Sequence, residues 1–293
     1  DAADVLDAGD SANDYFNYTV SDGNGGTDIA KITITILGAN DAPVAQNDVG
    51  VIDEGQTLSV ANGANANVSG NYDADDEHTG DVIHTSLAGS KDTDIDGDDT
   101  ANLVVSAIRV GSTEGSGTAG TVGDALTGTY GQLTLNANGS YSYVANQDAA
   151  DALDPGDIVY DYFTINGDTD LTITVIGIND TPIADNETNS TDVSTTLTVT
   201  DGSSDVLAGD TDADADASLT VSAIRTGSSE GSGDAGTIGS ALNGSYGVLT
   251  MAADGTYTYV AGSSAGTDSF TYTVTDEFGA TDIATLTITV NSS

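Results

Sequence analysis

An all-β fold of tandem β-sandwich repeats is predicted by three observations on the sequence. Long segments recur in the same order, apolar and polar residues alternate over short runs, and turn-forming residues separate those runs. The chain has 293 residues, which is enough for about two ordinary domains or for more units if each is small. We therefore expect small all-β units repeated along the chain.

Internal repetition sets the expected boundaries. The segment that starts at Asn40 aligns without a gap on the segment that starts at Asn179, and a later pair of segments aligns Val105 with Val221. The two offsets differ, which predicts an acidic insertion at 76–102 in the first of these copies. We expect three parts: 1–43 as the C-terminal part of an incomplete repeat, 44–182 as a complete β-sandwich repeat, and 183–293 as another β-sandwich repeat.

The local patterns within each copy are those of strands. Residues 30–37, 170–177 and 284–290 alternate β-branched apolar residues with Thr, as half-buried strands do. Residues 130–144 and 246–260 each contain two such runs joined by an Asn/Asp-Gly turn, which predicts a hairpin. No segment shows a helical pattern of convincing length.

The charge of the chain limits its partners. Forty-seven acidic residues against four basic ones give a formal net charge of −43, so nucleic acids and anionic membranes are excluded as partners. No apolar run is long enough to span a bilayer, and the lack of cysteine excludes disulfides and thiolate metal sites. Such a chain needs cations to fold compactly, supplied by bound calcium or by the diffuse screening of a saline habitat.

Three segments carry a resemblance to a known family. They are "FNYTVSDGNGGTDIAKITITILGANDAPVA", "DVLAGDTDADADASLTVSAI" and "YGVLTMAADGTYTYV". Together they are similar to VCBS-type and bacterial cadherin-like tandem repeats of large calcium-dependent surface adhesins. The resemblance implies an immunoglobulin-like or cadherin-like sandwich in an exported, rod-like array stiffened by calcium. The copy at 44–182 departs from the pattern, because it has "INGDTD" in place of the "SDGNGG" turn and carries the insertion.

Calcium sites are predicted where Asp and Asn cluster on loops, because calcium takes six to eight oxygen ligands. In a sandwich whose strands alternate in direction, the incoming linker and two of the loops lie at the same pole. We therefore expect Asn40 and Asp41 to lie near Asp73 and Asp75. In the next copy we expect Asn179 and Asp180 to lie near Asp212 and Asp214, joined by Asp276.

Two further acidic segments are candidate ion sites. The first holds Asp92, Asp94, Asp96 and Asp98; it imitates the start of an EF-hand loop but has Leu103 where that loop needs a Glu. The second is the "SDGNGGTD" turn with Asp22, Asn24 and Asp28. The alternative for each single Asp is a turn residue whose carboxylate accepts hydrogen bonds from nearby backbone amides.

The predicted function is non-catalytic, because ligand sets that repeat with the modules indicate structure, whereas an enzyme needs its site once. We expect calcium-stabilised extender repeats of a secreted or cell-surface bacterial adhesin or biofilm-matrix protein, with neighbouring repeats as partners. A second possibility is a subunit of an extracellular filament, in which identical chains join by strand addition. A third, a carbohydrate-binding module, is disfavoured because the chain has no Trp to stack on sugar.

Overall fold

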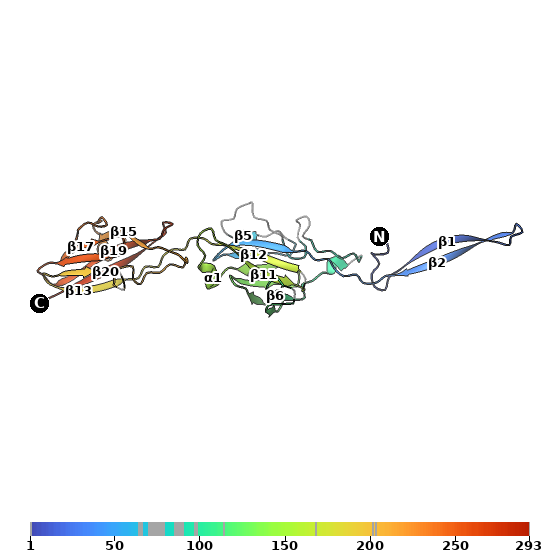
Figure 1. The fold of residues 1–293 in the computed structure, drawn as a ribbon, viewed down its shortest axis with the longest axis horizontal. Coiled ribbons are helices and arrows are strands. Elements are labelled where there is room, and N and C mark those ends of the chain that lie inside the picture. Colours follow the sequence, from blue (N-terminus) through green and yellow to red (C-terminus); the bar gives the residue numbers. More distant parts are fainter. Residues whose placement is uncertain are drawn as a thin grey trace. The chain divides into compact units, whose positions relative to one another are not determined.

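The computed structural model describes residues 2–63, 67–69, 80–84, 91–96, 99–113, 115–167, 169–200, 202 and 204–292. The chain divides into two compact units, which we describe separately. Unit 1 comprises Asp1–Ala150 and Ile158–Ile176, and unit 2 comprises Asp151–Asp157 and Gly177–Ser293. Figure 1 labels their main elements.

Unit 2 is a sandwich of two four-stranded sheets. The first sheet has the order β13 (Glu187–Asp192), β20 (Thr281–Asn291), β19 (Gly266–Thr275) and β15 (Thr220–Thr226). The second has the order β14 (Thr196–Val199), β18 (Tyr257–Ala261), β17 (Gly247–Met251) and β16 (Leu242–Asn243). Leu286, Ile288 and Val290 alternate with Thr along β20 and are buried, so the strand pattern expected at 284–290 is confirmed.

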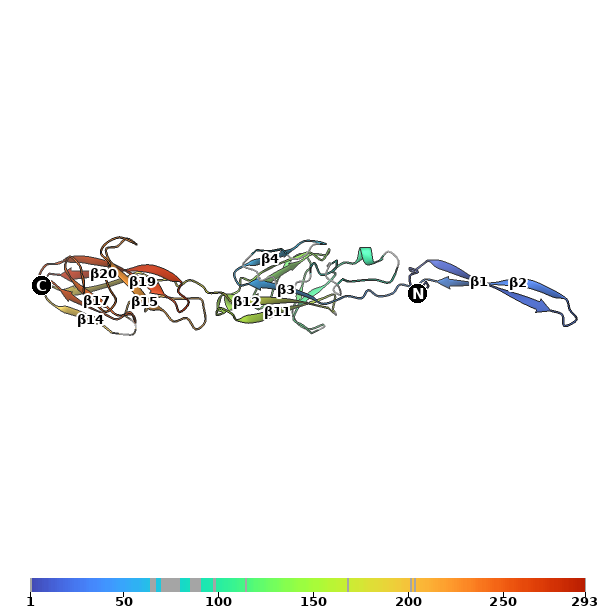
Figure 2. The same cartoon turned by 90° about the horizontal axis from the view of Figure 1, so that it is seen from above.

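Unit 1 contains an equivalent sandwich of two five-stranded sheets (Figure 2). One sheet has the order β5 (Asn67–Ser69), β4 (Thr57–Val60), β10 (Tyr141–Val144), β9 (Gln132–Leu135) and β8 (Ala125–Thr127). The other has the order β3 (Asp48–Asp53), β12 (Thr169–Ile176), β11 (Ile158–Ile165), β6 (Ile108–Val110) and β7 (Ala119–Gly120). The predicted hairpins at 130–144 and 246–260 are present as β9–β10 and β17–β18.

The first strand of each sandwich pairs in parallel with the last. β3 lies beside β12 with Asp48 opposite Leu171, and β13 lies beside β20 with Glu187 opposite Leu286. The other neighbouring strands of both sandwiches pair antiparallel. The alternation of residues within a strand gives its buried face but not its neighbour, so the sequence did not predict this parallel pair.

A buried tyrosine and a buried aspartate connect the two layers in the same way in both sandwiches. The Tyr143 hydroxyl on β10 donates to Asp161 on β11 at 2.6 Å, and the Tyr259 hydroxyl on β18 donates to Asp268 on β19 at 2.6 Å. Asp161 also accepts hydrogen bonds from the amides of Thr129, Tyr130 and Gly131. The alternating tyrosines of these strands are therefore core residues, and their aspartate partners are saturated with hydrogen bonds.

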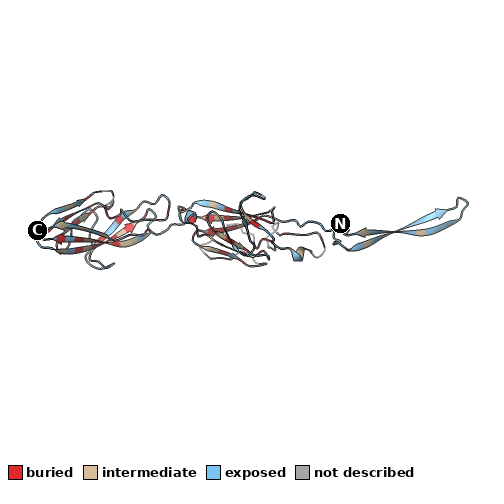
Figure 3. Ribbon diagram, turned by 90° about the horizontal axis from the view of Figure 1, so that it is seen from below, coloured by how far each residue is buried: buried red, intermediate tan, exposed pale blue. Residues whose placement is uncertain are grey.

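A separate hairpin, β1 (Ser11–Ser21) with β2 (Thr27–Leu37), precedes the sandwich of unit 1. Its Phe16 and Ile32 are 53% and 47% exposed, whereas Phe270 and Leu286, at the matching places of β19 and β20, are fully buried. Figure 3 shows the contrast between the exposed hairpin and the buried inner faces of the sheets. The hairpin thus has the form of the last two strands of a sandwich.

The structure confirms the predicted all-β fold of repeated sandwiches. The described helical segments are α1 (Asp148–Asp151) and the 3-10 helix η1 (Asp99–Asn102). Within the described residues, no helix has the length and apolar character needed to cross a membrane. The boundaries at 43 and 182 remain a prediction, although the sheets fall inside the three expected ranges.

Candidate metal centre

The candidate site of unit 2 is formed where the segment that enters the sandwich meets the loop before β15. Ile183 and Thr211 form an isolated antiparallel bridge, which fixes the entering segment against the loop. Beside it, the Asp180 amide donates to Asp214 Oδ2 at 3.1 Å, and the Asp214 amide donates to Asp212 Oδ1 at 3.2 Å. The structure thus brings Asp180, Asp212 and Asp214 together, as the sequence predicted.

The turn between β19 and β20 adds Asp276 to this group. Asp276 Oδ1 accepts hydrogen bonds from the amides of Phe278, Gly279 and Ala280, and its Oδ2 accepts one from Asn179 Nδ2 at 2.9 Å. Burial is the largest influence on the pKa of Asp276 and raises it, but these hydrogen bonds outweigh burial and hold the pKa below its usual value. Asp276 therefore stays ionised and anchors Asn179.

The carboxylates of this site repel one another. Asp180 and Asp214 place carboxylate oxygens within 4.8 Å of each other, and Asp214 is only 5% exposed. Desolvation raises the pKa of Asp180, and the charges of Asp151 and Asp212 add to the shift. Desolvation also raises the pKa of Asp214, opposed by the Asp180 amide and assisted by the charges of Asp212, Asp180 and Asp154. Without a cation, negative charge at this site is costly.

Several oxygen atoms of the site have no hydrogen-bond donor. Among the residues that the structure describes, buried Asn179 Oδ1, Asp212 Oδ2 and Asp214 Oδ1 find no hydrogen-bond partner. A buried oxygen that lacks a donor costs free energy unless a cation takes the donor's place. Because all these atoms are hard oxygen ligands, the donor set fits Ca²⁺ and does not fit a soft metal.

Unit 1 repeats this arrangement with different residues from those that the ungapped alignment paired. The Asp41 amide donates to Asp96 Oδ2 at 2.8 Å, and the Asp96 amide donates to Asp94 Oδ1 at 3.0 Å. Val44 forms a bridge with Thr93, as Ile183 does with Thr211. Asp94 and Asp96 are therefore the counterparts of Asp212 and Asp214.

This equivalence changes the description of the insertion at 76–102. Asp92 accepts a hydrogen bond from the Gln46 amide as Asp210 does from the Asp185 amide, so 92–96 belong to the repeated framework. The Val82 amide donates to Gly139 O as the Val206 amide donates to Gly255 O. In sequence, the additional residues are thus divided among the intervals between these fixed points. Asp73, Asp75 and Asp98 lie outside the described residues, and their predicted role as ligands stays a prediction.

A third carboxylate joins the unit 1 site. Asp94, Asp96 and Asp99 each offer an oxygen within 4.8 Å of the others, and Asp96 is 2% exposed. Among the described residues, Asp96 Oδ1 has no hydrogen-bond partner. Sequence reasoning missed Asp99, because alternating positions suggested Asp98 and the helix η1 that presents Asp99 had no clear sequence signal.

Another repeated segment was also missed as part of the sites. The segment "DAADVLDAGD" at the start of the chain contains Asp7, whose charge raises the pKa of Asp99 after the larger effect of desolvation. The similar "DAADALDPGD" contains Asp154, whose Oδ1 accepts a hydrogen bond from the Asp216 amide at 3.4 Å. The recurrence of this segment could have indicated a role near the sites, but we used it only to recognise the repeats.

The "SDGNGGTD" turn shows the capping role that was the alternative for a single Asp. Asp22 Oδ1 accepts hydrogen bonds from the amides of Asn24 and Gly26 at 2.7 and 2.9 Å, and these bonds lower the pKa of Asp22. Asp28 Oδ1 accepts a hydrogen bond from the Ile29 amide at 2.8 Å. These residues are exposed, and an ion at this turn remains a prediction.

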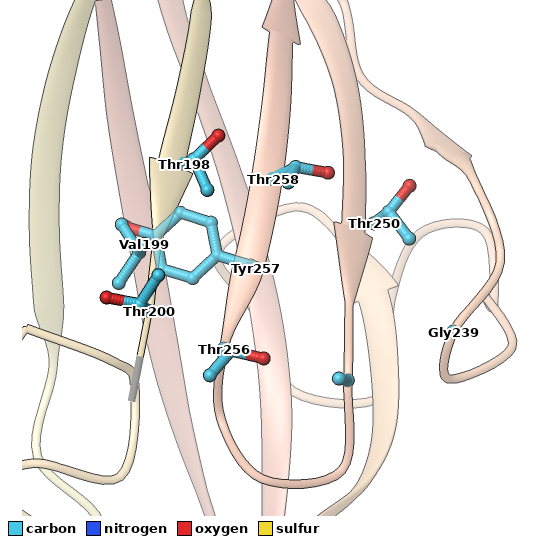
Figure 4. A pocket seen from close by; sticks show the side chains of 9 residues that line it. Thr198, Val199, Thr200, Gly239, Thr250, Thr256, Tyr257 and Thr258 are labelled. Atoms are coloured by element: carbon cyan, nitrogen blue, oxygen red, sulfur yellow. The ribbon is translucent and has the colours of Figure 1, made fainter. Parts of the chain in front are cut away.

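A shallow pocket in unit 2 bears on the carbohydrate alternative. Figure 4 shows the pocket between β14, β17 and β18, where threonine side chains surround Tyr257. Tyr257 is buried, and its hydroxyl accepts a hydrogen bond from Asn189 Nδ2 at 3.1 Å. This lining does not offer the exposed aromatic surface on which a sugar would stack.

Comparison with known proteins found one family match and several similar solved structures. Residues 179–292 match the family described as bacterial cadherin-like domain. Among solved structures, the EC22-24 segment of mouse cadherin-23 is similar at 14% identity and a TM-score of 0.39, over 95% of this chain and 74% of that chain. Extracellular cadherin domains 1-5 of protocadherin Gamma B2 are similar at 12% identity and a TM-score of 0.32, over 99% of this chain.

The chain spans 47% of the protocadherin Gamma B2 structure, and no curated protein sequence matches it. The match at 179–292 shows that the C-terminal repeat is similar to a bacterial cadherin-like domain. The expected resemblance to tandem bacterial cadherin-like repeats is therefore confirmed.

Proposed function

We propose that this chain is a set of calcium-stabilised structural repeats that extend an extracellular bacterial adhesin or biofilm-matrix protein, without catalytic activity. The observation that supports it best is that buried carboxylate oxygens with no donor in the described part of the chain occur at equivalent places, Asp96 in unit 1 and Asp214 in unit 2. The family match adds an extracellular, adhesion-type setting, where calcium is abundant.

In this proposal the ion acts on the segment that enters each sandwich. Asp41 and Asp180 lie on those segments, while Asp96 and Asp214 lie on loops of the sandwich itself. An ion shared by both would replace carboxylate repulsion with attraction and would hold the entering segment in place. Calcium tolerates the irregular loop geometry of such a site, whereas magnesium demands near-octahedral coordination and releases water reluctantly.

Thermal unfolding of the chain in EDTA, in millimolar calcium and in millimolar magnesium tests this proposal. Binding to the folded state stabilises it by about 4 kcal/mol per site when free calcium exceeds Kd a thousandfold. We expect a large, calcium-specific rise in Tm that is reduced in Asp214→Asn and in Asp96→Asn. The matched control is Asp124→Asn, an exposed carboxylate on another loop. Equal Tm values in EDTA and calcium would contradict the proposal.

A further inference from the structure

The two candidate sites share one hydrogen bond between the entering segment and a loop, but the rest of that loop is held by different contacts in each unit. In both units an Asp of the entering segment donates a hydrogen bond from its backbone amide to the second Asp of an Asp-x-Asp loop. The pairs are Asp41 with Asp96 and Asp180 with Asp214. Beyond that residue the loops diverge, and each loop is fixed by a different partner. The difference affects which further acidic residue lies near the Asp-x-Asp loop of each repeat.

In unit 2 the end of the loop is fixed by the β19–β20 turn. Glu277 Oε2 accepts hydrogen bonds from Ser218, from the amide at 2.8 Å and from the hydroxyl at 3.5 Å. The neighbouring Asp276 accepts from Asn179. An acidic residue of the turn between the last two strands thus contacts the entering segment of unit 2 through Asn179.

In unit 1 the loop is held by hydrogen bonds between its own residues. The Thr100 hydroxyl accepts a hydrogen bond from the Asp94 amide and donates to the Asp94 carbonyl oxygen, both at 2.8 Å. The Asp99 amide donates to Asp96 O at 3.4 Å, which starts η1. This fold-back places the Asp99 carboxylate within 4.8 Å of those of Asp94 and Asp96.

The β11–β12 turn of unit 1, which corresponds to the β19–β20 turn of unit 2, makes different hydrogen bonds. Asn166, the last residue before Gly167, accepts hydrogen bonds through its Oδ1 from the amides of Ser106 and Ala107, at 2.7 and 3.2 Å. Its side chain therefore fixes the segment before β6, a role different from that of Asp276. Among the described residues of unit 1, it is η1 that adds a carboxylate to those of Asp94 and Asp96.

A second observation points from this cluster to a ligand. Asp96, which is 2% exposed, has a buried Oδ1 without a hydrogen-bond partner among the described residues, and it belongs to the same group of oxygens as Asp99. A nearly fully buried carboxylate oxygen of this kind is stabilised by a cation with oxygen ligands, and the three carboxylates can supply them.

We propose that Asp99 is a calcium ligand of unit 1, in the role that we predict for Asp276 in unit 2, so that Asp94, Asp96 and Asp99 supply most of the charge for the unit 1 ion. This inference rests on the proposed function, because it assigns one further ligand to one of its two sites. It also means that the two repeats bind calcium through different third carboxylates and respond to different substitutions.

Calcium titration of the full chain, followed by amide resonances, tests the assignment site by site. Thr100 reports on unit 1 and Ala280, whose amide donates to Asp276, reports on unit 2. We expect Asp99→Asn to weaken binding at the Thr100 reporter by about tenfold or more and to leave the Ala280 reporter unchanged, because affinity follows the number of charged ligands. Asp276→Asn should show the opposite selectivity, and Asp124→Asn should change neither reporter.

Asp96→Asn separates failure of this inference from failure of the proposed function. If Asp96→Asn abolishes the unit 1 response while Asp99→Asn stays within about twofold of the parent chain, Asp99 is not a ligand and the inference is wrong. If the Thr100 reporter does not respond to calcium in the parent chain, the proposed function itself fails at this site. Asp99 is only half-buried, so its replacement by Asn is compatible with folding.

Discussion

Individual carboxylates of this chain have two distinct roles, which hydrogen bonding separates. Asp161 is 2% exposed and accepts hydrogen bonds from three amides and a tyrosine hydroxyl, so its charge is satisfied by the protein alone. Asp96 has the same burial but an oxygen without a donor among the described residues. The first residue is satisfied by the protein itself, whereas we propose that the second is stabilised by a cation.

The Tyr143–Asp161 contact offers a test of the first role. Tyr143→Phe removes the only side-chain hydroxyl that donates to Asp161 among the described hydrogen bonds. A hydrogen bond to a charged group contributes about 1.5–3 kcal/mol, and we expect that loss of unfolding free energy in urea denaturation. The control Tyr160→Phe, at a 47% exposed position on the same unit, should stay within about 0.5 kcal/mol of the parent chain. Equal losses in both variants would refute the role assigned to Tyr143.

The ungapped repeat alignment selected loop residues that lie beside the entering segment in unit 2, and the structure places others there in unit 1, for a physical reason. Asp212 and Asp214 follow Asn179 at a spacing that an ungapped repeat preserves, and the structure brings them together with Asp180. In unit 1 additional residues lie between the entering segment and the loop, so the ungapped alignment selected Asp73 and Asp75. Asp94 and Asp96, which contact Asp41 in the structure, were predicted as a separate ion site. Contacts across a loop of changed length cannot be derived from spacing.

At the scale of elements, a hairpin of this chain is stabilised by packing its apolar side chains against a second sheet. β19 and β20 bury Phe270 and Leu286 against the second sheet of unit 2, whereas the similar hairpin β1–β2 leaves Phe16 and Ile32 about half exposed. A lone two-stranded hairpin is only marginally stable in water. The patterns that predicted these strands were correct for both hairpins, because alternation reports a strand regardless of what covers it.

Removal of the hairpin tests this difference. In EDTA, a variant that starts at Gly38 should melt at the same temperature as the full chain, because the exposed hairpin adds little to either sandwich. Sedimentation of both forms tests the filament alternative at the same time. Oligomers that form with the full chain and not with the shortened one would favour strand addition through β1–β2, and a lower Tm of the shortened form would show that the hairpin is part of a cooperative unit.

At the scale of the whole molecule, the net charge of −43 opposes folding. Raising the salt concentration from 0.01 to 1 M shortens the screening length from about 30 Å to about 3 Å. In EDTA we therefore expect Tm to rise by several degrees with sodium chloride, and in saturating calcium we expect a smaller rise because bound ions already offset part of the repulsion. A Tm independent of salt in EDTA would mean that repulsion contributes little.

The sequence predicted the fold class because it depends on patterns that repeat. It did not predict the parallel pairing of β3 with β12 or of β13 with β20, because pairing depends on contacts between the two ends of a repeat. It also missed η1, since four residues give no helical periodicity.

That parallel pairing determines how a repeat responds when its ends are pulled apart. The chain enters unit 2's sandwich at the start of β13 and leaves it at the end of β20, and these two points lie at opposite ends of the paired segment from Glu187–Leu286 to Asp192–Asn291. Tension between them slides the two strands along each other, so the hydrogen bonds of the pair share the load and must break together. In an antiparallel pair the same two points would lie side by side, and the bonds would open one after another. The same holds for β3 and β12, so the pairing that closes each sheet also gives each repeat its resistance to tension.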